Sequence, residues 1–90
     1  MEIEFDPDKS ARNVRERGLA FELVAGFDFD TAIVAPDVRG VYGETRFVAV
    51  GLMDDRLHVV AYTMRGETLR VISFRKANAR EVHRYEQARS

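Results

Sequence analysis

The pattern of apolar and polar residues is most regular between residues 46 and 76. Three runs rich in β-branched and aromatic side chains are separated by two pairs of turn-forming residues, Asp54-Asp55 and Gly66-Glu67. Such runs with two-residue connections are typical of antiparallel strands joined by tight hairpins. We therefore expect a β-meander with strands at Phe47–Leu52, Leu57–Met64 and Leu69–Phe74.

Two-residue hairpin loops also fix the register of the three strands. Arg46 then lies opposite Thr63, and Thr63 opposite Arg70, so three polar side chains form one row across a single face. Strict alternation along the third strand places Phe74 on this same face. Both faces are largely apolar, so we expect each to be at least partly covered by helices. The residues of the third strand that we expect on the opposite face are Leu69, Val71, Ser73 and Arg75.

The segments that flank the meander predict the remaining elements. Glu2–Phe5 alternates polar and apolar residues, as expected for a short strand at an edge of the sheet. Asp6 followed by Pro7 is a helix start and Gly18 is a helix stop, which predicts a helix over Pro7–Arg17. We also expect a helix over Leu19–Phe27, a strand over Thr31–Ala35, a loop over Val38–Thr45 and a last helix over Ala77–Arg89.

These elements define an α+β fold, an antiparallel β-meander sheet with two N-terminal helices packed on it and a C-terminal helix. Ninety residues with 46% hydrophobic content are expected to form one domain, residues 1–90. The first residues show no basic region followed by an apolar run, so we expect a cytoplasmic protein without signal peptide or membrane span. The absence of cysteine excludes disulfides, thiolate chemistry and Cys-based zinc sites.

Charge is distributed unevenly along the chain. Residues 1–63 contain seven Lys or Arg against twelve Asp or Glu, whereas residues 64–90 contain seven against three. Arg is far more frequent than Lys, and its planar guanidinium group suits bidentate contacts with phosphate or carboxylate. The basic C-terminal third therefore favours contact with nucleic acid or with an acidic protein surface.

No common catalytic motif accounts for this charge, since the chain lacks a phosphate-binding glycine loop, an HExxH motif, a nucleophile elbow and an acidic metal cluster. The strongest candidate is the row of Arg46, Thr63 and Arg70, with Arg65 at its end. Guanidinium groups at this spacing repel one another unless an anion lies among them. That anion is either Glu44, in a purely structural network, or a phosphodiester of RNA, whose cleavage arginines can promote without a metal.

Other residues are weaker candidates for chemistry. His58 and His83 are of the residue type most often used as a general base, but His58 lies at the opposite end of its strand from the row. Arg75 and Lys76, at the junction of the last strand and the last helix, favour anions. The last helix has a narrow apolar stripe of Val82, Tyr85 and Ala88. Apolar side chains of a partner chain could pack against this stripe.

Four segments of the chain, in order, carry a resemblance to a known family. They are FDPDKSARNVRERG, GLAFE, YGETR and VVAYTMRGETLRVISFRKANAREVHRYE. Together they resemble the BrnT toxins of BrnT/BrnA-type toxin–antitoxin modules, over nearly the whole chain. The sequence departs from the family pattern at Glu16-Arg17, where Lys-His is usual, and at Phe74, where Ala is usual and a phenylalanine indicates deeper packing.

The resemblance implies a bacterial ribonuclease toxin with a RelE-like fold that inhibits translation by cleaving RNA, free or on the ribosome. A small BrnA-type antitoxin would neutralise it, and operator DNA would be contacted only through the antitoxin complex. No metal or other cofactor is expected. The alternative is a non-catalytic binding module whose basic end docks a protein partner or nucleic acid.

The candidate residues fall into three groups. Those expected to act in catalysis are Glu44, Arg46, Arg65, Arg70 and Arg75, with Glu44 as the base or as the group that orients the arginines. Those expected to contact RNA are Lys76, Thr63 and Ser73, and those expected to contact the antitoxin are Val82 and Tyr85.

Overall fold

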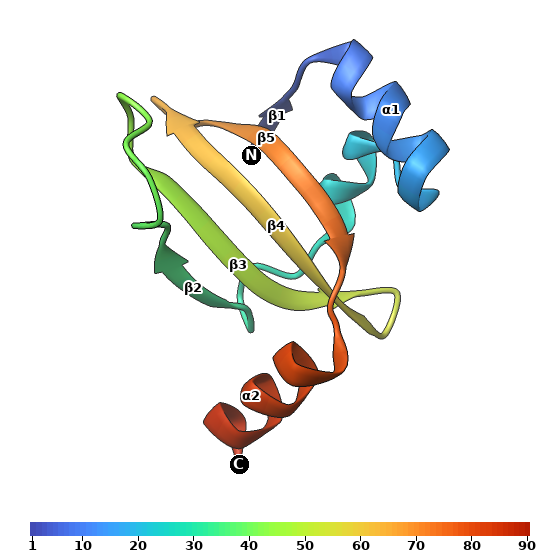
Figure 1. Ribbon diagram of the computed structural model, residues 1–90, viewed down its shortest axis with the longest axis vertical. Coiled ribbons are helices and arrows are strands. Elements are labelled where there is room, and N and C mark those ends of the chain that lie inside the picture. The colour runs from blue at the N-terminus through green and yellow to red at the C-terminus, as the bar shows by residue number, and fades with distance from the viewer.

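A five-stranded sheet with strand order β1-β5-β4-β3-β2 forms the centre of the computed structural model, which describes residues 1–90 (Figure 1). Its middle strands confirm the predicted meander. The edge strand β1 pairs with β5 in parallel, so the prediction of a wholly antiparallel sheet is wrong at this edge. Alternation in so short a strand specifies its faces but not its direction. The strands are β1 (Glu2–Glu4), β2 (Ile33–Pro36), β3 (Arg46–Met53), β4 (Arg56–Arg65) and β5 (Thr68–Lys76).

Both hairpins of the meander turn through two residues, as predicted. Asp54 and Asp55 have φ angles of 50° and 61°, which is the pattern of a type I′ turn. In the second turn only the first residue, Gly66, has a positive φ, 63°, as in a type II′ turn. The predicted register of the polar row is therefore confirmed, with Arg46 opposite Thr63 and Thr63 opposite Arg70.

A β-bulge changes the faces predicted for the end of β5. The register between β4 and β5 shifts by one residue, so that Tyr62 pairs with Val71 whereas Ala61 pairs with Ser73. Ile72 is the extra residue, and it exchanges the faces of all residues that follow it. The predicted faces are therefore wrong, and are reversed in the structure, for Ser73, Phe74 and Arg75.

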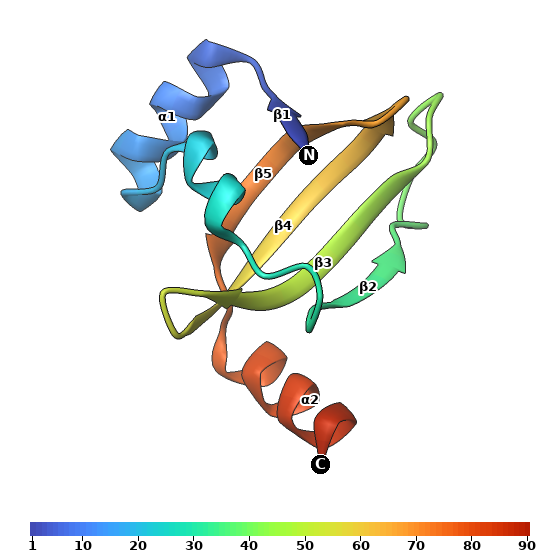
Figure 2. The ribbon, with the colours of Figure 1, turned by 180° about the vertical axis from the view of Figure 1, so that it is seen from behind.

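One face of the sheet, the inner face, packs against residues 19–29, whereas the first helix lies beside the β5 edge of the sheet (Figure 2). Helix α1 (Pro7–Arg17) has the predicted ends, with the Asp6 carboxylate accepting a hydrogen bond of 2.9 Å from the Asp8 amide and Gly18 in the left-handed region. The second helix is shorter than predicted and is the 3-10 helix η1 (Phe21–Gly26), whose first amide, of Phe21, donates a 2.9 Å hydrogen bond to the Ser10 hydroxyl of α1. The core consists of Leu19, Phe21, Val24, Phe27, Ala49, Met53, Val60, Tyr62, Leu69, Val71 and Phe74.

A buried amide joins α1 to the sheet. The Asn13 side chain is 8% exposed, and its Nδ2 donates hydrogen bonds to the carbonyl oxygens of Leu19 at 2.7 Å and Phe74 at 2.8 Å. Both amide hydrogens are thereby satisfied, and the bond to Phe74 holds β5 at the residue where the bulge has turned its side chain into the core.

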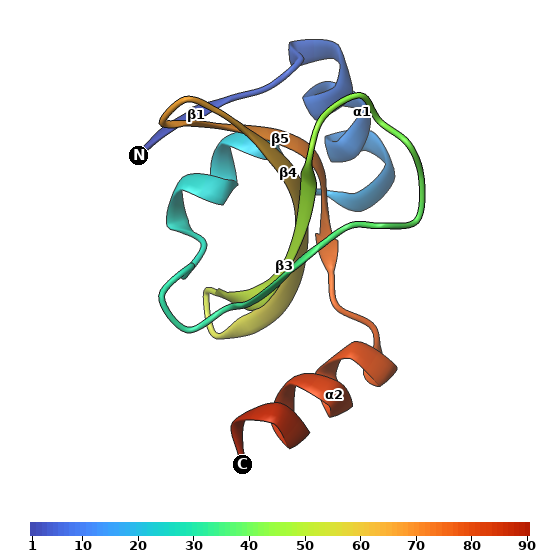
Figure 3. The same ribbon diagram turned by 90° about the vertical axis from the view of Figure 1, so that its left-hand side faces the viewer.

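The opposite face, the outer face, carries the polar row and lies on the side of the loop of residues 37–45 and of helix α2 (Ala79–Arg89) (Figure 3). Helix α2 begins after Asn78, whose side chain and Glu81 form a capping box. The Tyr85 hydroxyl donates a 3.1 Å hydrogen bond to the Thr31 carbonyl, and the side chain is 9% exposed, so Tyr85 anchors α2. Neither α1 nor α2 has the length and apolar character needed to cross a bilayer.

Candidate functional site

The polar row crosses the outer face at the end of the sheet farthest from α2 (Figure 1). The side chains of Arg46 and Arg70 are 30% and 31% exposed. Between them Thr63 is 2% exposed, and its hydroxyl donates a 2.7 Å hydrogen bond to the carbonyl of Thr45. Thr63 therefore fixes the chain where it enters β3, and the two arginines are the groups of the row that a ligand can reach.

Arg46 is held by a ring and by one carboxylate. Its guanidinium carbon lies 4.0 Å from the centroid of the Tyr42 ring, within range of a cation–π interaction. Its Nε lies 3.8 Å from Glu44 Oε1, which is too long for a hydrogen bond, and this buried nitrogen has no hydrogen-bond partner. Packing and Coulomb attraction therefore position the guanidinium group and leave its N–H donors free for an anionic ligand.

At the other end of the row, one carboxylate forms ion pairs with two arginines. Glu4 Oε1 lies 3.6 Å from Arg70 Nη1 and 3.9 Å from Arg65 Nη1, and the Glu4 side chain is 41% exposed. Ion pairs of this length and exposure are weak, whereas phosphate forms shorter, charge-assisted hydrogen bonds with guanidinium groups. Sequence analysis did not identify Glu4, because only the parallel pairing of β1 brings it beside Arg70.

A second group of arginines lies farther along the outer face. Arg75 pairs with Val59, four residues before Thr63 on β4, which places it about 13 Å from the row. The bulge turns Ser73 and Arg75 into a cleft of about 330 Å³, and we call it the arginine cleft. Its polar lining residues are Asp37, Arg39, Ser73, Arg75 and Glu81.

Two bidentate ion pairs form the walls of the arginine cleft. Arg75 donates to both carboxylate oxygens of Glu81 at 2.7 and 2.8 Å. Arg39 donates to both carboxylate oxygens of Asp37 at 2.9 Å. These hydrogen bonds lower the pKa of Glu81 and of Asp37 to about 2. Both carboxylates are thus ionised near neutral pH and are weak bases, so they orient arginines instead of accepting protons.

Sequence analysis overlooked Asp37, Arg39 and Glu81. The spacing Asn78-x-x-Glu81 is itself a capping-box signal that could have placed Glu81 at the start of α2, within reach of Arg75. No comparable local signal marks Asp37 and Arg39, because they lie in a loop and meet Arg75 only through the folded sheet.

The Glu81–Arg75 pair gives a prediction for acid unfolding. The folded pKa of Glu81, about 2, is below its ordinary value of 4.5, so the stabilisation is complete above that ordinary value and is lost as pH falls toward 2. Glu81→Gln should therefore lower the melting temperature at neutral pH, and the difference from wild type should shrink between about pH 5 and pH 2. Glutamine retains the capping function, so the difference reports the charge.

Glu86→Gln, an exposed change on the same helix, is the matched control for thermal unfolding across this pH range. A difference between wild type and Glu81→Gln that stays constant from neutral pH to pH 2 would show that the ion pair is not its source.

The remaining predicted residues lie away from both groups of arginines. Lys76 is exposed at the end of β5, opposite His58 on the inner face. His58 is 3% exposed, and its Nδ1 donates a 2.7 Å hydrogen bond to the Arg56 carbonyl, so the ring is a packing element. Val82 and Tyr85 line a hollow of about 420 Å³ between α2 and the β3–β4 hairpin. No three His, Asp or Glu side chains are grouped so that they could hold a metal ion.

One protein family matches most of the chain. Its sequence profile, described as "Ribonuclease toxin, BrnT, of type II toxin-antitoxin system", matches residues 5–81. The matched range contains every residue of the polar row and of the arginine cleft, and omits Glu4 and most of α2. No protein of curated function matches the chain.

Proposed function

Because the chain belongs to the BrnT family of ribonuclease toxins of type II toxin–antitoxin systems, we propose that it inhibits translation by cutting RNA without a metal ion, at the polar row of its outer face. The observation that carries this proposal is the loose pairing of the row, whose arginines contact carboxylates only at 3.6 to 3.9 Å. Arginines held in this way can exchange a carboxylate for a phosphodiester with little loss.

Arg46 and Arg70 are spaced to contact one phosphate from two sides. They lie on strands separated by β4, so their Cα atoms are roughly 10 Å apart, a span that two extended arginine side chains bridge. When the 2′-hydroxyl oxygen attacks phosphorus and the 5′-oxygen departs, negative charge builds up on the non-bridging oxygens. Fixed guanidinium groups stabilise this charge more than that of the bound substrate, which lowers the barrier.

Glu44 is the proposed base. It is the carboxylate nearest Arg46 and is exposed to solvent, whereas the carboxylates of the arginine cleft are held in bidentate pairs. In this role Glu44 takes the proton of the 2′-hydroxyl while the arginines hold the phosphate, and the departing 5′-oxygen takes a proton from water. Arg65, beside Glu4, adds a further positive charge at the end of the row.

The arginine cleft is proposed to bind a neighbouring phosphate of the same RNA strand. A distance of about 13 Å from the row is too large for one phosphate to contact both groups. Because Glu81 fixes Arg75 in a bidentate pair, this contact positions the strand with little loss of side-chain freedom on binding. A BrnA-type antitoxin would keep the toxin inactive, and the partly exposed arginines of the row are open to it or to RNA.

The proposal is tested by incubating the purified chain with naked RNA in EDTA and, in a parallel reaction, with translating ribosomes in the magnesium buffer that ribosomes require. We expect cleavage in at least one of these reactions, with products that carry a 2′,3′-cyclic phosphate and a 5′-hydroxyl. Cleavage that needs added Mg²⁺ and leaves a 3′-hydroxyl would refute the mechanism. RNA binding with no cleavage in either reaction would support a non-catalytic binding module instead.

A further inference from the structure

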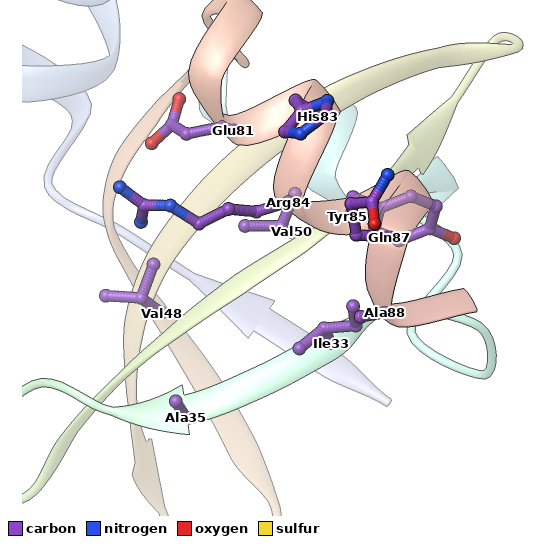
Figure 4. A pocket seen from close by; sticks show the side chains of 10 residues that line it. All are labelled: Ile33, Ala35, Val48, Val50, Glu81, His83, Arg84, Tyr85, Gln87 and Ala88. Carbon is purple, nitrogen blue, oxygen red and sulfur yellow. The ribbon is translucent and has the colours of Figure 1, made fainter. Parts of the chain in front are cut away.

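An apolar groove separates α2 from the outer surface of β2 and β3 (Figure 4). Its volume is about 670 Å³, and α2 forms one wall while the two strands form the other. Ile33, on the edge strand, is 38% exposed, so apolar surface is open to solvent there. The apolar lining residues are Ile33, Ala35, Val48, Val50, Tyr85 and Ala88.

The groove runs into the arginine cleft. Val48 and Glu81 line both, so the two hollows meet at these residues. Glu81 is also the residue that fixes Arg75. A molecule lying in the groove would therefore end beside Arg75, where we place a phosphate of the RNA strand.

A cation without a salt bridge lines the groove, together with six apolar and three other polar residues. Figure 4 shows the Arg84 side chain extending from α2 toward the side where Glu81 and Val48 lie. Arg84 takes part in none of the salt bridges of the structure, and Glu81 is already paired with Arg75. The groove thus has apolar walls and one guanidinium group without a salt bridge. A carboxylate on the bound molecule would form that salt bridge with Arg84.

We propose that this groove binds an amphipathic segment of the antitoxin, with apolar side chains between α2 and the strands and a carboxylate against Arg84. The inference rests on the proposed function, because a type II toxin has an antitoxin partner. The segment inhibits by occlusion, since its end covers the arginine cleft and blocks the path of the RNA strand. RNA fits the groove less well, because six of the groove's ten lining residues are apolar and Arg84 is the only Lys or Arg among them.

The test measures binding of the antitoxin encoded beside the toxin gene to purified variants by calorimetry. Arg84→Glu is expected to weaken binding by about tenfold or more, because the new carboxylate at position 84 repels the carboxylate of the antitoxin. Arg80→Glu, the same change at an exposed position on α2 outside the groove, should stay within about twofold of wild type. Both variants should cleave RNA at the wild-type rate, since neither arginine lies in the row or the cleft.

A second pair of variants tests the apolar walls of the groove without removing any core side chain. Ala88→Arg fills the groove from an exposed position and should also weaken antitoxin binding by about tenfold. Its control is Ala11→Arg, at an exposed position of α1.

Three outcomes would overturn the inference. Wild-type antitoxin affinity in both Arg84→Glu and Ala88→Arg would show that the groove is not the antitoxin site. Loss of RNA affinity in these variants with antitoxin affinity intact would assign the groove to RNA. If light scattering shows that the wild-type chain is a dimer and that Ala88→Arg is a monomer, the groove would be assigned to a second copy of the chain. If the wild-type chain neither cleaves RNA nor binds the antitoxin, the proposed function fails as well.

Discussion

Replacing Arg70 with alanine is expected to slow RNA cleavage by about a hundredfold or more, the usual cost of losing one fixed donor to developing charge in a transition state. The fold should tolerate the change, because the Arg70 side chain is 31% exposed and its ion-pair partner is Glu4 at 3.6 Å. Single-turnover cleavage at saturating protein measures the effect on the chemical step apart from RNA binding.

Arg12→Ala is the matched control for Arg70→Ala. Arg12 is an exposed arginine on α1 with no ion pair, so its loss removes the same charge from another part of the molecule. We expect its cleavage rate to stay within about twofold of wild type. Equal rates for the two variants would mean that the row has no special role in the reaction.

Replacing Phe74 with alanine is expected to destabilise the protein by about 3 to 5 kcal/mol, the range for truncating a buried phenylalanine. Phe74 is 0% exposed and belongs to the core only because the bulge turns it to the inner face. Urea unfolding of Phe74→Ala and of Ile72→Ala compares the two sides of the bulge. Ile72 is only partly buried, so its truncation should cost clearly less. A larger loss for Ile72→Ala would contradict the bulged register.

The meander was predictable from sequence because its turns are short and their residues suit positive φ angles. Counting from the turns gives the correct partners of Arg46 and Arg70. The same count fails beyond Ile72, since a bulge adds one residue without any turn residue to mark it. The phenylalanine at position 74 was the one hint from the sequence that this position packs deeply, and its complete burial confirms that interpretation.

The candidate site was only partly predictable for a related reason. The register between neighbouring strands determines which residues form the row, so its arginines could be placed from the sequence. The carboxylate beside Arg46 is Glu44, two residues away in the sequence, and it was predicted, whereas the carboxylate beside Arg70 is Glu4 of β1, far away in the sequence. The pairing of Glu4 with Arg70 has no local signature, because it depends on the direction of an edge strand.

The rival surface for RNA is α1, which lies beside the β5 edge of the sheet (Figure 2) and carries four basic residues. These residues are Lys9, Arg12, Arg15 and Arg17.

The most direct test of the central claim is therefore to map bound RNA on the protein by NMR, with a short 2′-O-methyl RNA that lacks the attacking hydroxyl and so is not cleaved. We expect the backbone signals of Arg46, Arg70, Ser73 and Arg75 to shift on titration, while those of α1 stay in place. Shifts confined to α1, with the signals of the outer face unchanged, would contradict the assignment of the polar row as the RNA site.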